Sequence, residues 1–310
     1  MIAAAGVGVV AAALISVWAV WTRLPKRAFP RHPGDIAFAA VDAKLAAAME
    51  RLDSEPENLQ ALVEAGALHF LKGPDQYRIA LNELEEARRL GSADPRLFYY
   101  LGVMYQEEGL LPFAVAEYRR FVRNFPEDRE ARLLLGKLLY QTGRYEDAAV
   151  QFQSLGRLAR DPVIEENLGL SLLALKRYDE AAKSFAALLP RPAFEARARF
   201  YLGQAAFEAE RWTEAREQLA KAAAAAPAQL EGVEPTALWA MVAATDEKLQ
   251  DWTAAADHWQ RLLQLDPKSA KAKASLRRLA PKLRAQRKAS AAATAGAKAA
   301  APKRRSARKR

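Results

Sequence analysis

The sequence predicts an all-α protein, a solenoid built from about six helix–turn–helix units. The first observation is a repeat, because Gly102, Gly136, Gly169 and Gly203 follow one another at intervals of 34, 33 and 34 residues. The second is that an alanine lies twelve residues after each of these glycines, inside a further stretch of helical apolar spacing. A period of this length is typical of stacked helix pairs, which bury a continuous core against one another.

Charge divides the chain of 310 residues into an acidic body and two basic ends. Residues 1–34 hold four basic residues and no acidic one, and residues 268–310 hold sixteen basic residues and no acidic one. All 37 acidic residues therefore lie in residues 35–267, against 27 basic ones. Such asymmetry is typical of ends that contact a membrane surface or nucleic acid.

Residues 1–23 are predicted to form a transmembrane anchor. Residues 2–22 carry no charge, and about 20 apolar residues in a helix are enough to cross a bilayer. The basic residues of this end follow the run and none precedes it, so the positive-inside rule places the rest of the chain in the cytoplasm. We therefore expect a single-pass protein of the inner (cytoplasmic) membrane. The alternative is an exported body, with the repeats in the periplasm.

A proline-containing spacer is expected over residues 24–34, because its prolines prevent continuation of the helix. From Asp35 to Leu52 an apolar stripe at helical spacing then predicts one amphipathic helix, which Pro56 ends. The stripe consists of Ile36, Val41, Leu45, Met49 and Leu52.

Six helix pairs are expected to follow, which completes a solenoid over residues 35–267. The first pair carries Gly66 in its first helix, and the next four carry the glycines of the repeat. The sixth pair is degenerate, since Ala243 replaces the glycine. A glycine or alanine in the first helix allows the second helix to approach closely, so these positions form a packing pattern and not a ligand loop.

Residues 57–267 resemble the tetratricopeptide repeat (TPR) family, a helix–turn–helix unit of this period. The resemblance implies that the pairs stack into a superhelix with a concave groove. It also implies a scaffold or adaptor that binds other proteins. The N-terminal anchor makes the layout similar to that of bacterial, membrane-anchored members of the family.

Peptide ligands of TPR proteins usually lie against groove-facing residues of the first helix of each pair. By this resemblance we expect the partner-binding groove to contain Arg96, Tyr99, Val103, Gln106, Lys137, Tyr140, Arg197, Phe200, Gln204 and Phe207. Corresponding positions hold Glu130, Leu133, Val163, Glu166, Leu170 and Leu173. Aromatic residues on a rigid concave surface suit capture of an extended or helical peptide. The alternative is that the aromatic residues pack against neighbouring helices or against the chain's own helix at residues 35–55.

No catalytic, cofactor or metal site is expected. The chain has no cysteine, and its three histidines, His32, His69 and His258, share no metal-ligand spacing. It also has no nucleophile elbow and no glycine-rich loop that would cradle a phosphate. The sequence therefore indicates a protein that is not an enzyme.

The C-terminal part is predicted to form a capping helix over residues 268–288 and a disordered basic tail over 289–310. Ala272, Leu276, Leu279 and Leu283 keep helical spacing, although Pro281 interrupts the helix. The tail has no large apolar residue and ends in a basic cluster, Lys303, Arg304, Arg305, Arg308, Lys309 and Arg310. Such a cluster suits anionic lipid, the body's own acidic surface or nucleic acid, or it has no specific role.

The sequence thus favours a membrane-anchored scaffold that binds partner proteins through the groove. The alternative is a membrane tether that binds nucleic acid through the basic tail.

Overall fold

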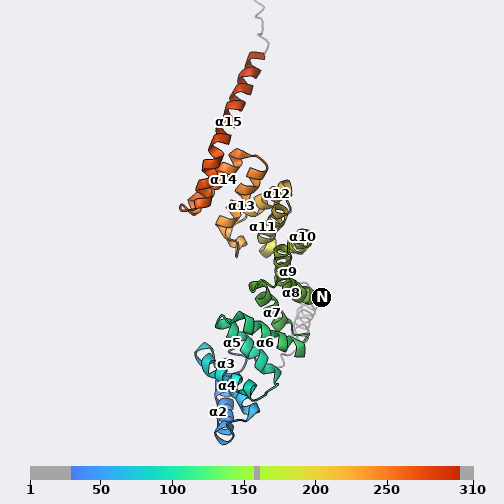
Figure 1. Ribbon diagram of the computed structural model, residues 1–310, viewed down its shortest axis with the longest axis vertical. Coiled ribbons are helices and arrows are strands. Elements are labelled where there is room, and N and C mark those ends of the chain that lie inside the picture. The colour runs from blue at the N-terminus through green and yellow to red at the C-terminus, as the bar shows by residue number, and fades with distance from the viewer. Residues whose placement is uncertain (1–28, 157–160, 301–310) are drawn as a thin grey trace, which may run out of the picture. The chain divides into compact units, whose positions relative to one another are not determined.

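The computed structural model describes residues 29–156 and 161–300. The chain divides into two compact units, of which unit 1 ends at Ala131 and unit 2 begins at Arg132. Every regular element in the described ranges is a helix (Figure 1). The predicted fold class, an all-α arrangement of TPR-like helix pairs, is confirmed for these residues.

Unit 1 contains one single helix followed by two helix pairs. Its helices are α2 (Phe38–Ser54), α3 (Leu59–Lys72), the short 3₁₀ helix η1 (Pro74–Gln76), α4 (Tyr77–Arg89), α5 (Pro95–Glu107) and α6 (Leu111–Asn124). The pairs are α3/α4 and α5/α6, and α2 packs against α3.

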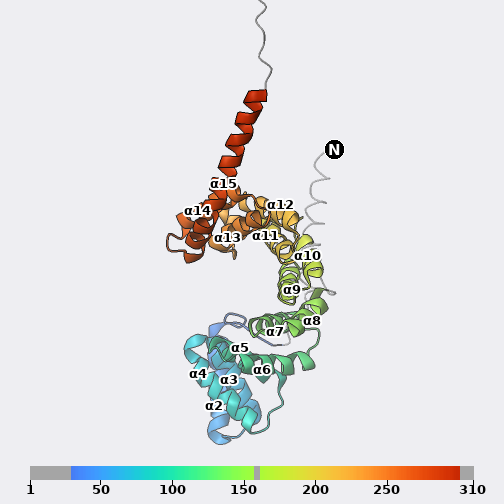
Figure 2. The same cartoon turned by 45° about the horizontal axis from the view of Figure 1, so that its top comes forward.

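Unit 2 contains four helix pairs and a long last helix, and its first helix α7 begins three residues before the boundary. Its helices are α7 (Arg129–Gln141), α8 (Tyr145–Gly156), α9 (Pro162–Ala174), α10 (Tyr178–Ala186), α11 (Pro192–Glu208), α12 (Trp212–Ala223), the 3₁₀ helix η2 (Pro227–Leu230), α13 (Pro235–Lys248), α14 (Trp252–Leu265) and α15 (Ala270–Ala300). We call the first helix of each pair the A helix and the second the B helix. Figures 1 and 2 both show α11 beside α12 and α13 beside α14.

The repeat glycines lie where the A and B helices cross. A methyl group added at Gly169 would stand 2.5 Å from the Phe185 ring, and one at Gly136 would stand 2.7 Å from the Phe152 ring. The alanine of each B helix is fully buried at the same crossing. Small residues thus allow the two backbones to approach, and the large B-helix residue fills the space beside the glycine.

The last five A helices, α5, α7, α9, α11 and α13, end in the same left-handed turn, whatever residue occupies it. Gly109 and Gly143 adopt φ of 72° and 76° at this turn, and Lys176, Glu210 and Gln250 adopt 60° at the equivalent position of the later pairs. Left-handed backbone is free of strain only for glycine, so the last three turns are held by the packing of the pair rather than by local preference.

Helix α2 differs from the sequence prediction. It starts at Phe38 rather than Asp35, and Val41 and Ala48 are its buried residues. Of the predicted apolar stripe only Val41 is buried, while Met49 is exposed. A helix with one packed neighbour needs only a narrow apolar face, which explains why most of the stripe stays accessible.

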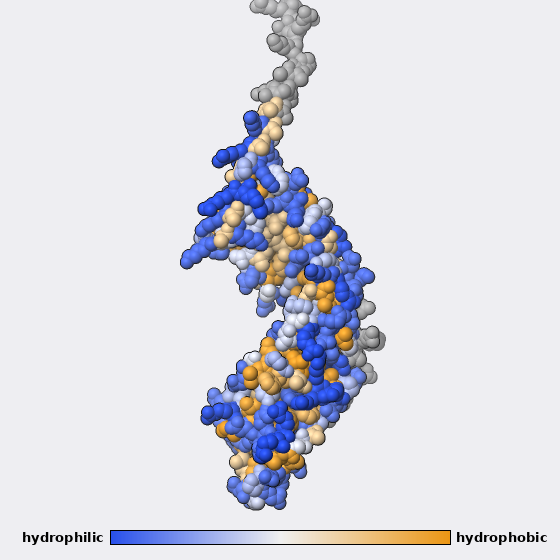
Figure 3. Space-filling model, in the orientation of Figure 1, coloured by the Kyte–Doolittle hydropathy of each residue, from blue (hydrophilic) through white to orange (hydrophobic). Residues whose placement is uncertain are grey.

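Helix α15 packs against the last pair and is longer than the helix expected at 268–288. Leu279 and Ala272 are buried in a cluster with Trp259 of α14, while Leu276 and Leu283 pack at its edge. The helix continues through Ala300, so residues 289–300, which were expected to be disordered, belong to it. Alanine has the highest helix propensity, and this segment is mostly alanine. Figure 3 shows hydrophilic and hydrophobic residues interspersed where α15 leaves the last pair.

None of the helices in residues 29–156 and 161–300 carries an apolar stretch long enough to cross a bilayer. The predicted anchor at 1–23, residues 24–28 of the spacer and residues 301–310 of the tail lie outside these ranges.

Candidate protein-interaction surfaces

The chain's own residues 29–35, which we call the N-terminal strap, cover part of the A helix α5 in unit 1. Phe29, only 8% exposed, sits among three rings of the α5/α6 pair. Its ring centroid lies 5.5 Å from Tyr100, 5.7 Å from Tyr99 and 5.8 Å from Phe121, each in an edge-to-face arrangement. In Figure 2 the bluest part of the chain, before α2, runs beside α5.

Arg31 is the second anchor of the strap and is 2% exposed. Its guanidinium lies 4.7 Å from the centre of the Tyr99 ring and forms a two-point ion pair with Asp128, with Nη1 2.9 Å from Oδ1. Nη1 also lies 3.3 Å from a Glu130 carboxylate oxygen. The arginine is therefore sandwiched between an aromatic face and two carboxylates.

Polar contacts hold the strap between and after these anchors. The Tyr100 hydroxyl donates to the Pro30 carbonyl oxygen at 2.6 Å. The backbone N–H groups of Arg31 and His32 donate to one Asp35 carboxylate oxygen at 2.7 and 3.0 Å, which folds the strap into a turn. The strap thus enters α2 in a fixed direction.

The electrostatics keep Arg31 and Tyr99 each in one protonation state at neutral pH. Burial alone would lower the pKa of Arg31, but the hydrogen bond and charge of Asp128 and the charge of Glu130 raise it overall. Burial, followed by the charge of Glu130, raises the pKa of Tyr99, whose hydroxyl donates to Glu130 Oε1 at 2.8 Å. Arg31 therefore stays charged and Tyr99 stays neutral.

The strap contributes to the stability of unit 1. Full burial of a phenylalanine side chain contributes about 1.5–3 kcal/mol. Removal of one partner from a buried, hydrogen-bonded ion pair costs about 3–5 kcal/mol, because the remaining charge is left uncompensated.

Among the predicted groove residues of unit 1, Tyr99 is therefore not accessible, and its alternative assignment to internal packing is the one observed. It packs against the strap at residues 29–31, not against the helix at 35–55. Arg96 is half-buried and paired with Asp94, which caps α5, at 2.6 Å. Val103 and Gln106 are half-buried.

In unit 2 an ion pair joins two neighbouring A helices. Arg197 of α11 lies 2.5 Å from a Glu166 carboxylate oxygen of α9 and donates to the Glu231 carbonyl oxygen at 2.9 Å. Burial raises the pKa of Glu166, and the charge of Arg197 partly offsets this. The predicted groove residue Arg197 thus has internal partners on both sides.

The predicted aromatic groove residues of unit 2 divide into two classes. Phe200 is buried in a cluster with Leu238 and Val242 of the next A helix. Tyr140 and Phe207 are half-exposed near the ends of α7 and α11, where they pack against Tyr145 at 5.3 Å and against Trp212 at 5.0 Å. Gln204 is half-buried and Lys137 is exposed. Tyr140, Phe207, Gln204 and Lys137 are therefore the predicted residues that a partner can reach in unit 2.

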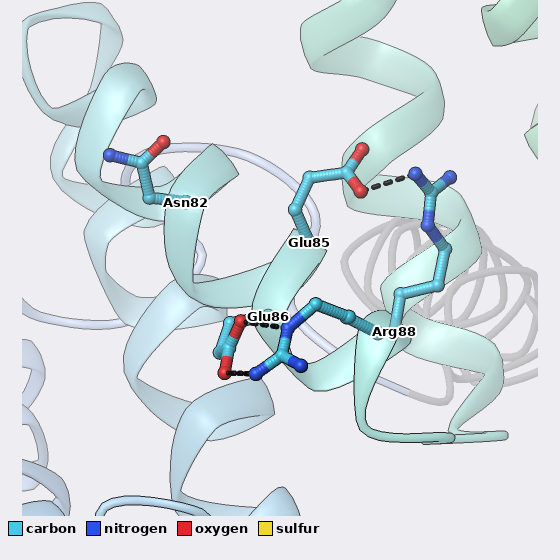
Figure 4. A pocket seen from close by; sticks show the side chains of 5 residues that line it. Asn82, Glu85, Glu86 and Arg88 are labelled. Atoms are coloured by element: carbon cyan, nitrogen blue, oxygen red, sulfur yellow. Dashed lines mark hydrogen bonds and ion pairs between the residues drawn. The ribbon is translucent and has the colours of Figure 1, made fainter.

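In the described part of the chain, the charged side chains that line a surface hollow on α4 form ion pairs with one another. A hollow of about 470 Å³ along α4 is lined by Asn82, Glu85, Glu86, Arg88 and Arg89. Figure 4 shows Glu85 paired with Arg88, while Asn82 stands apart. Glu86 pairs with Arg89 on the same helix. No group of three or more acidic or histidine side chains with metal-binding geometry occurs among the residues that the structure describes. The basic cluster at 303–310 lies outside them.

Sequence reasoning assigned the strap to a spacer and so missed Phe29 and Arg31. An aromatic residue and an arginine that flank a proline, within an otherwise helix-free segment, are the signal that could have found them. Asp128 was also missed. As the residue before an A helix it reads as a helix cap, and it does accept from the Ala131 N–H at 3.0 Å.

Comparison with known proteins supports the repeat assignment. Residues 109–162 and 166–229 match the family model described as tetratricopeptide repeat. No match was found among curated protein sequences.

Several solved structures share the fold at low sequence identity. The C-terminal part of a TPR repeat-containing protein from Cytophaga hutchinsonii is 18% identical, with a TM-score of 0.56, over 77% of this chain and 99% of that one. YrrB, described as a TPR protein with an unusual peptide-binding site, is 22% identical, with a TM-score of 0.50, over 57% of this chain and 91% of that one. The chain spans 46% of the chain matched in the APC/C hetero-tetramer Cut9–Hcn1, at 17% identity and a TM-score of 0.47. At these identities the likeness shows the fold alone.

Proposed function

We propose, on the premise of this TPR-type fold, that the protein is a scaffold that binds a partner protein through the A-helix surface of unit 2. The observation that carries the proposal is a difference in how far A-helix aromatic side chains are covered, compared between the described residues of unit 1 and unit 2. In unit 1 the A-helix residue Tyr99 is buried under the strap, whereas in unit 2 Tyr140 and Phe207 are only partly buried.

The chemistry of these positions suits a peptide or a helix of a partner. Half-exposed aromatic rings supply contact area at a small cost in conformational entropy, and Gln204 and Lys137 supply adaptable polar contacts beside them. Rings already packed against Tyr145 and Trp212 are held in place before binding, which reduces the entropy lost on association.

The test compares partner capture by three full-length proteins. The surface variant carries Tyr140→Ala with Phe207→Ala. The control carries Phe113→Ala with Leu265→Ala, two exposed apolar side chains on the B helices α6 and α14. Circular dichroism first establishes that all three proteins fold. Affinity capture from membranes should lose its partner with the surface variant and keep it with the control; equal capture by both would contradict the proposal.

We further propose that residues 1–23 anchor the scaffold in the inner membrane, with the repeats in the cytoplasm. The support is the charge-free run at 2–22 and the basic residues that follow it directly. An anchor concentrates the scaffold and its partner at one surface, which raises their effective concentration.

Topology reporters fused after residue 34 and after residue 288 test the orientation. Cytoplasmic activity from both fusions is the expected result. Periplasmic activity from both would reverse the orientation and place the partner on the other side of the membrane.

A further inference from the structure

We propose that unit 1 contains a peptide-binding site for an aromatic residue followed, two positions later, by an arginine, and that the chain fills this site with its own Phe29-Pro30-Arg31. The site consists of Tyr99, Tyr100, Phe121, Asp128 and Glu130, and we call it the aromatic–arginine site. It concerns unit 1 only, so it does not depend on the function proposed for unit 2.

The aromatic half of the site selects a ring. Phe29 enters among Tyr99, Tyr100 and Phe121 with ring planes at 68–79° to its own, so the edges and faces of the rings interact. Edge-to-face pairs are favoured by the ring quadrupoles in addition to burial of the apolar surface. An aliphatic side chain in place of Phe29 would lose that part of the interaction.

The arginine half selects a guanidinium over an ammonium group. The two Arg31 Nη atoms face the two oxygens of Asp128, and Glu130 accepts a further bond while it also accepts from Tyr99. A planar guanidinium fits two carboxylate oxygens at once and stacks on a ring at the same time. Lysine would keep the charge but lose both geometries.

The middle position suits proline. Its carbonyl oxygen accepts from the Tyr100 hydroxyl, and proline has no N–H group that would be left without a partner on the surface of the pair. Its fixed φ also restricts the backbone between the two anchors, which lowers the entropy lost when the segment binds.

The strap contacts unit 1 in the manner of a bound ligand rather than of a core element. Phe29 and Arg31 are buried, whereas the following residues 32–35 are exposed and continue to α2. Of these, exposed His32 still contacts the site, with Nε2 2.9 Å from Glu130 Oε1. Two buried anchors on a segment with an exposed continuation are typical of peptide recognition by pockets. The strap is covalently linked to its site and therefore has a high effective concentration there. A separate partner chain can displace it only if it binds with both anchors, an aromatic residue and an arginine.

The experiment measures binding of a fluorescent peptide with the sequence of residues 27–36 to the full-length protein in detergent. The receptor is compared as the wild type and as a strap-released variant with Phe29→Ala and Arg31→Ala. The released variant should bind the peptide at least tenfold more tightly than the wild type, because its own strap no longer competes. Equal binding by the two proteins, or no binding by a folded released variant, would overturn the proposal.

Two control peptides test the specificity. One replaces the arginine that corresponds to Arg31 by lysine, and the other exchanges the phenylalanine and that arginine, which keeps composition and charge. Each should bind at least tenfold more weakly than the parent peptide. Undiminished binding of the exchanged peptide would show that charge alone drives the interaction and would reject the site.

A second design covers the case in which the released variant does not fold. A site-specific protease sequence is inserted after Gly34 of the otherwise unchanged chain, which is cut after folding. Excess free peptide should then displace the cut N-terminal fragment, as seen by loss of its co-elution with the rest of the chain. A fragment that stays bound at saturating peptide would show a fixed core element and would reject an exchangeable ligand.

Discussion

Gly169 and Phe185 show at the scale of single residues how the repeat sets the spacing of a helix pair. Glycine inside a helix is normally unfavourable by about 1 kcal/mol relative to alanine. The glycine persists in the A helix because a Cβ would stand 2.5 Å from the Phe185 ring. Local helix preference and tertiary packing thus oppose each other here, and packing decides.

Gly169→Ala is expected to lower the free energy of unfolding by about 1–3 kcal/mol, the usual cost of overpacking a core. Gly156→Ala is the matched control, since no described atom lies within 4 Å of a Cβ at that position. Urea unfolding of both variants provides the measurement. A stabilised Gly169→Ala variant would show that Phe185 relaxes freely.

In the left-handed turn after the A helices, a substitution to glycine is expected to stabilise the protein, in contrast to the destabilising Gly169→Ala. Lys176 adopts φ of 60°, where a side chain costs about 1–2 kcal/mol, whereas Gly143 occupies the equivalent turn without strain. Lys176→Gly is therefore expected to raise the unfolding midpoint in urea, and Gly143→Ala to lower it. If Lys176→Gly destabilised the protein, the entropy of the unfolded glycine would outweigh the relief of strain.

Glu117 of α6 makes stability depend on pH. Burial raises the pKa of its carboxyl above the ordinary 4.5, while Arg120 and Arg88 lower it and Glu85 raises it further. The folded state therefore binds a proton more tightly than the unfolded state does. The contribution of this group is present below pH 4.5 and is lost as the pH rises through the raised folded value.

In Glu117→Gln this dependence should disappear, so the stability of the variant relative to the wild type should increase between about pH 4 and about pH 7. Urea unfolding at several pH values gives the comparison. A relative stability that falls with rising pH would mean that the ion pairs with Arg88 and Arg120 outweigh the desolvation of the carboxylate.

At the scale of elements, the last helix shows what one buried side chain does for a capping element. Leu279 of α15 is fully buried against α14, and Pro281 two residues later is exposed. Proline removes one backbone hydrogen bond from the helix, so contacts such as that of Leu279 supply the stability that local backbone preference lacks.

Leu279→Ala is expected to cost about 2–5 kcal/mol and to increase hydrogen exchange along α15 and α14. Leu265→Ala, at a half-exposed leucine of α14, should cost about 1 kcal/mol or less. Equal effects of the two substitutions would show that α15 does not cover the last pair in solution.

Sequence reasoning was most successful for these elements and least successful for surfaces. The six pairs follow from small residues that recur at the helix crossings, a glycine in five pairs and Ala243 in the sixth, because packing of neighbouring pairs imposes one pattern on them. The exposed stripe of α2 and the continuation of α15 were missed, because apolar spacing reports which face could be buried and not which neighbours exist. Tyr99 and Phe200 occupy equivalent positions, three residues before the glycine of their pairs, and both are buried. The strap covers Tyr99, whereas residues of the next A helix cover Phe200.

At the scale of the whole molecule, each of the two units has its own core. Phe29 belongs to unit 1, although it lies about seventy residues before Tyr99 and Tyr100 in the sequence. Helix pairs in repeat proteins interact mainly with their sequence neighbours, so a local change should stay local.

Phe29→Ala should therefore increase hydrogen exchange in α5 and α6 and leave α13 and α14 unchanged, with a loss of up to about 3 kcal/mol in unit 1. Leu238→Ala is the reciprocal variant, because Leu238 lies in the core shared by α11 and α13. Its effect should be confined to unit 2. Exchange that increased along the entire chain in either variant would show a single cooperative structure.

The sequence alone determined the helical class, the number of pairs and their order, because a residue repeated at a fixed interval meets the same neighbour in every unit. Only the tertiary structure decided which A-helix residues face solvent. Phe29 and Arg31 meet Tyr99, Asp128 and Glu130 across seventy to ninety-nine residues. These contacts depend on where the folded pairs bring side chains together, and no period in the sequence encodes them.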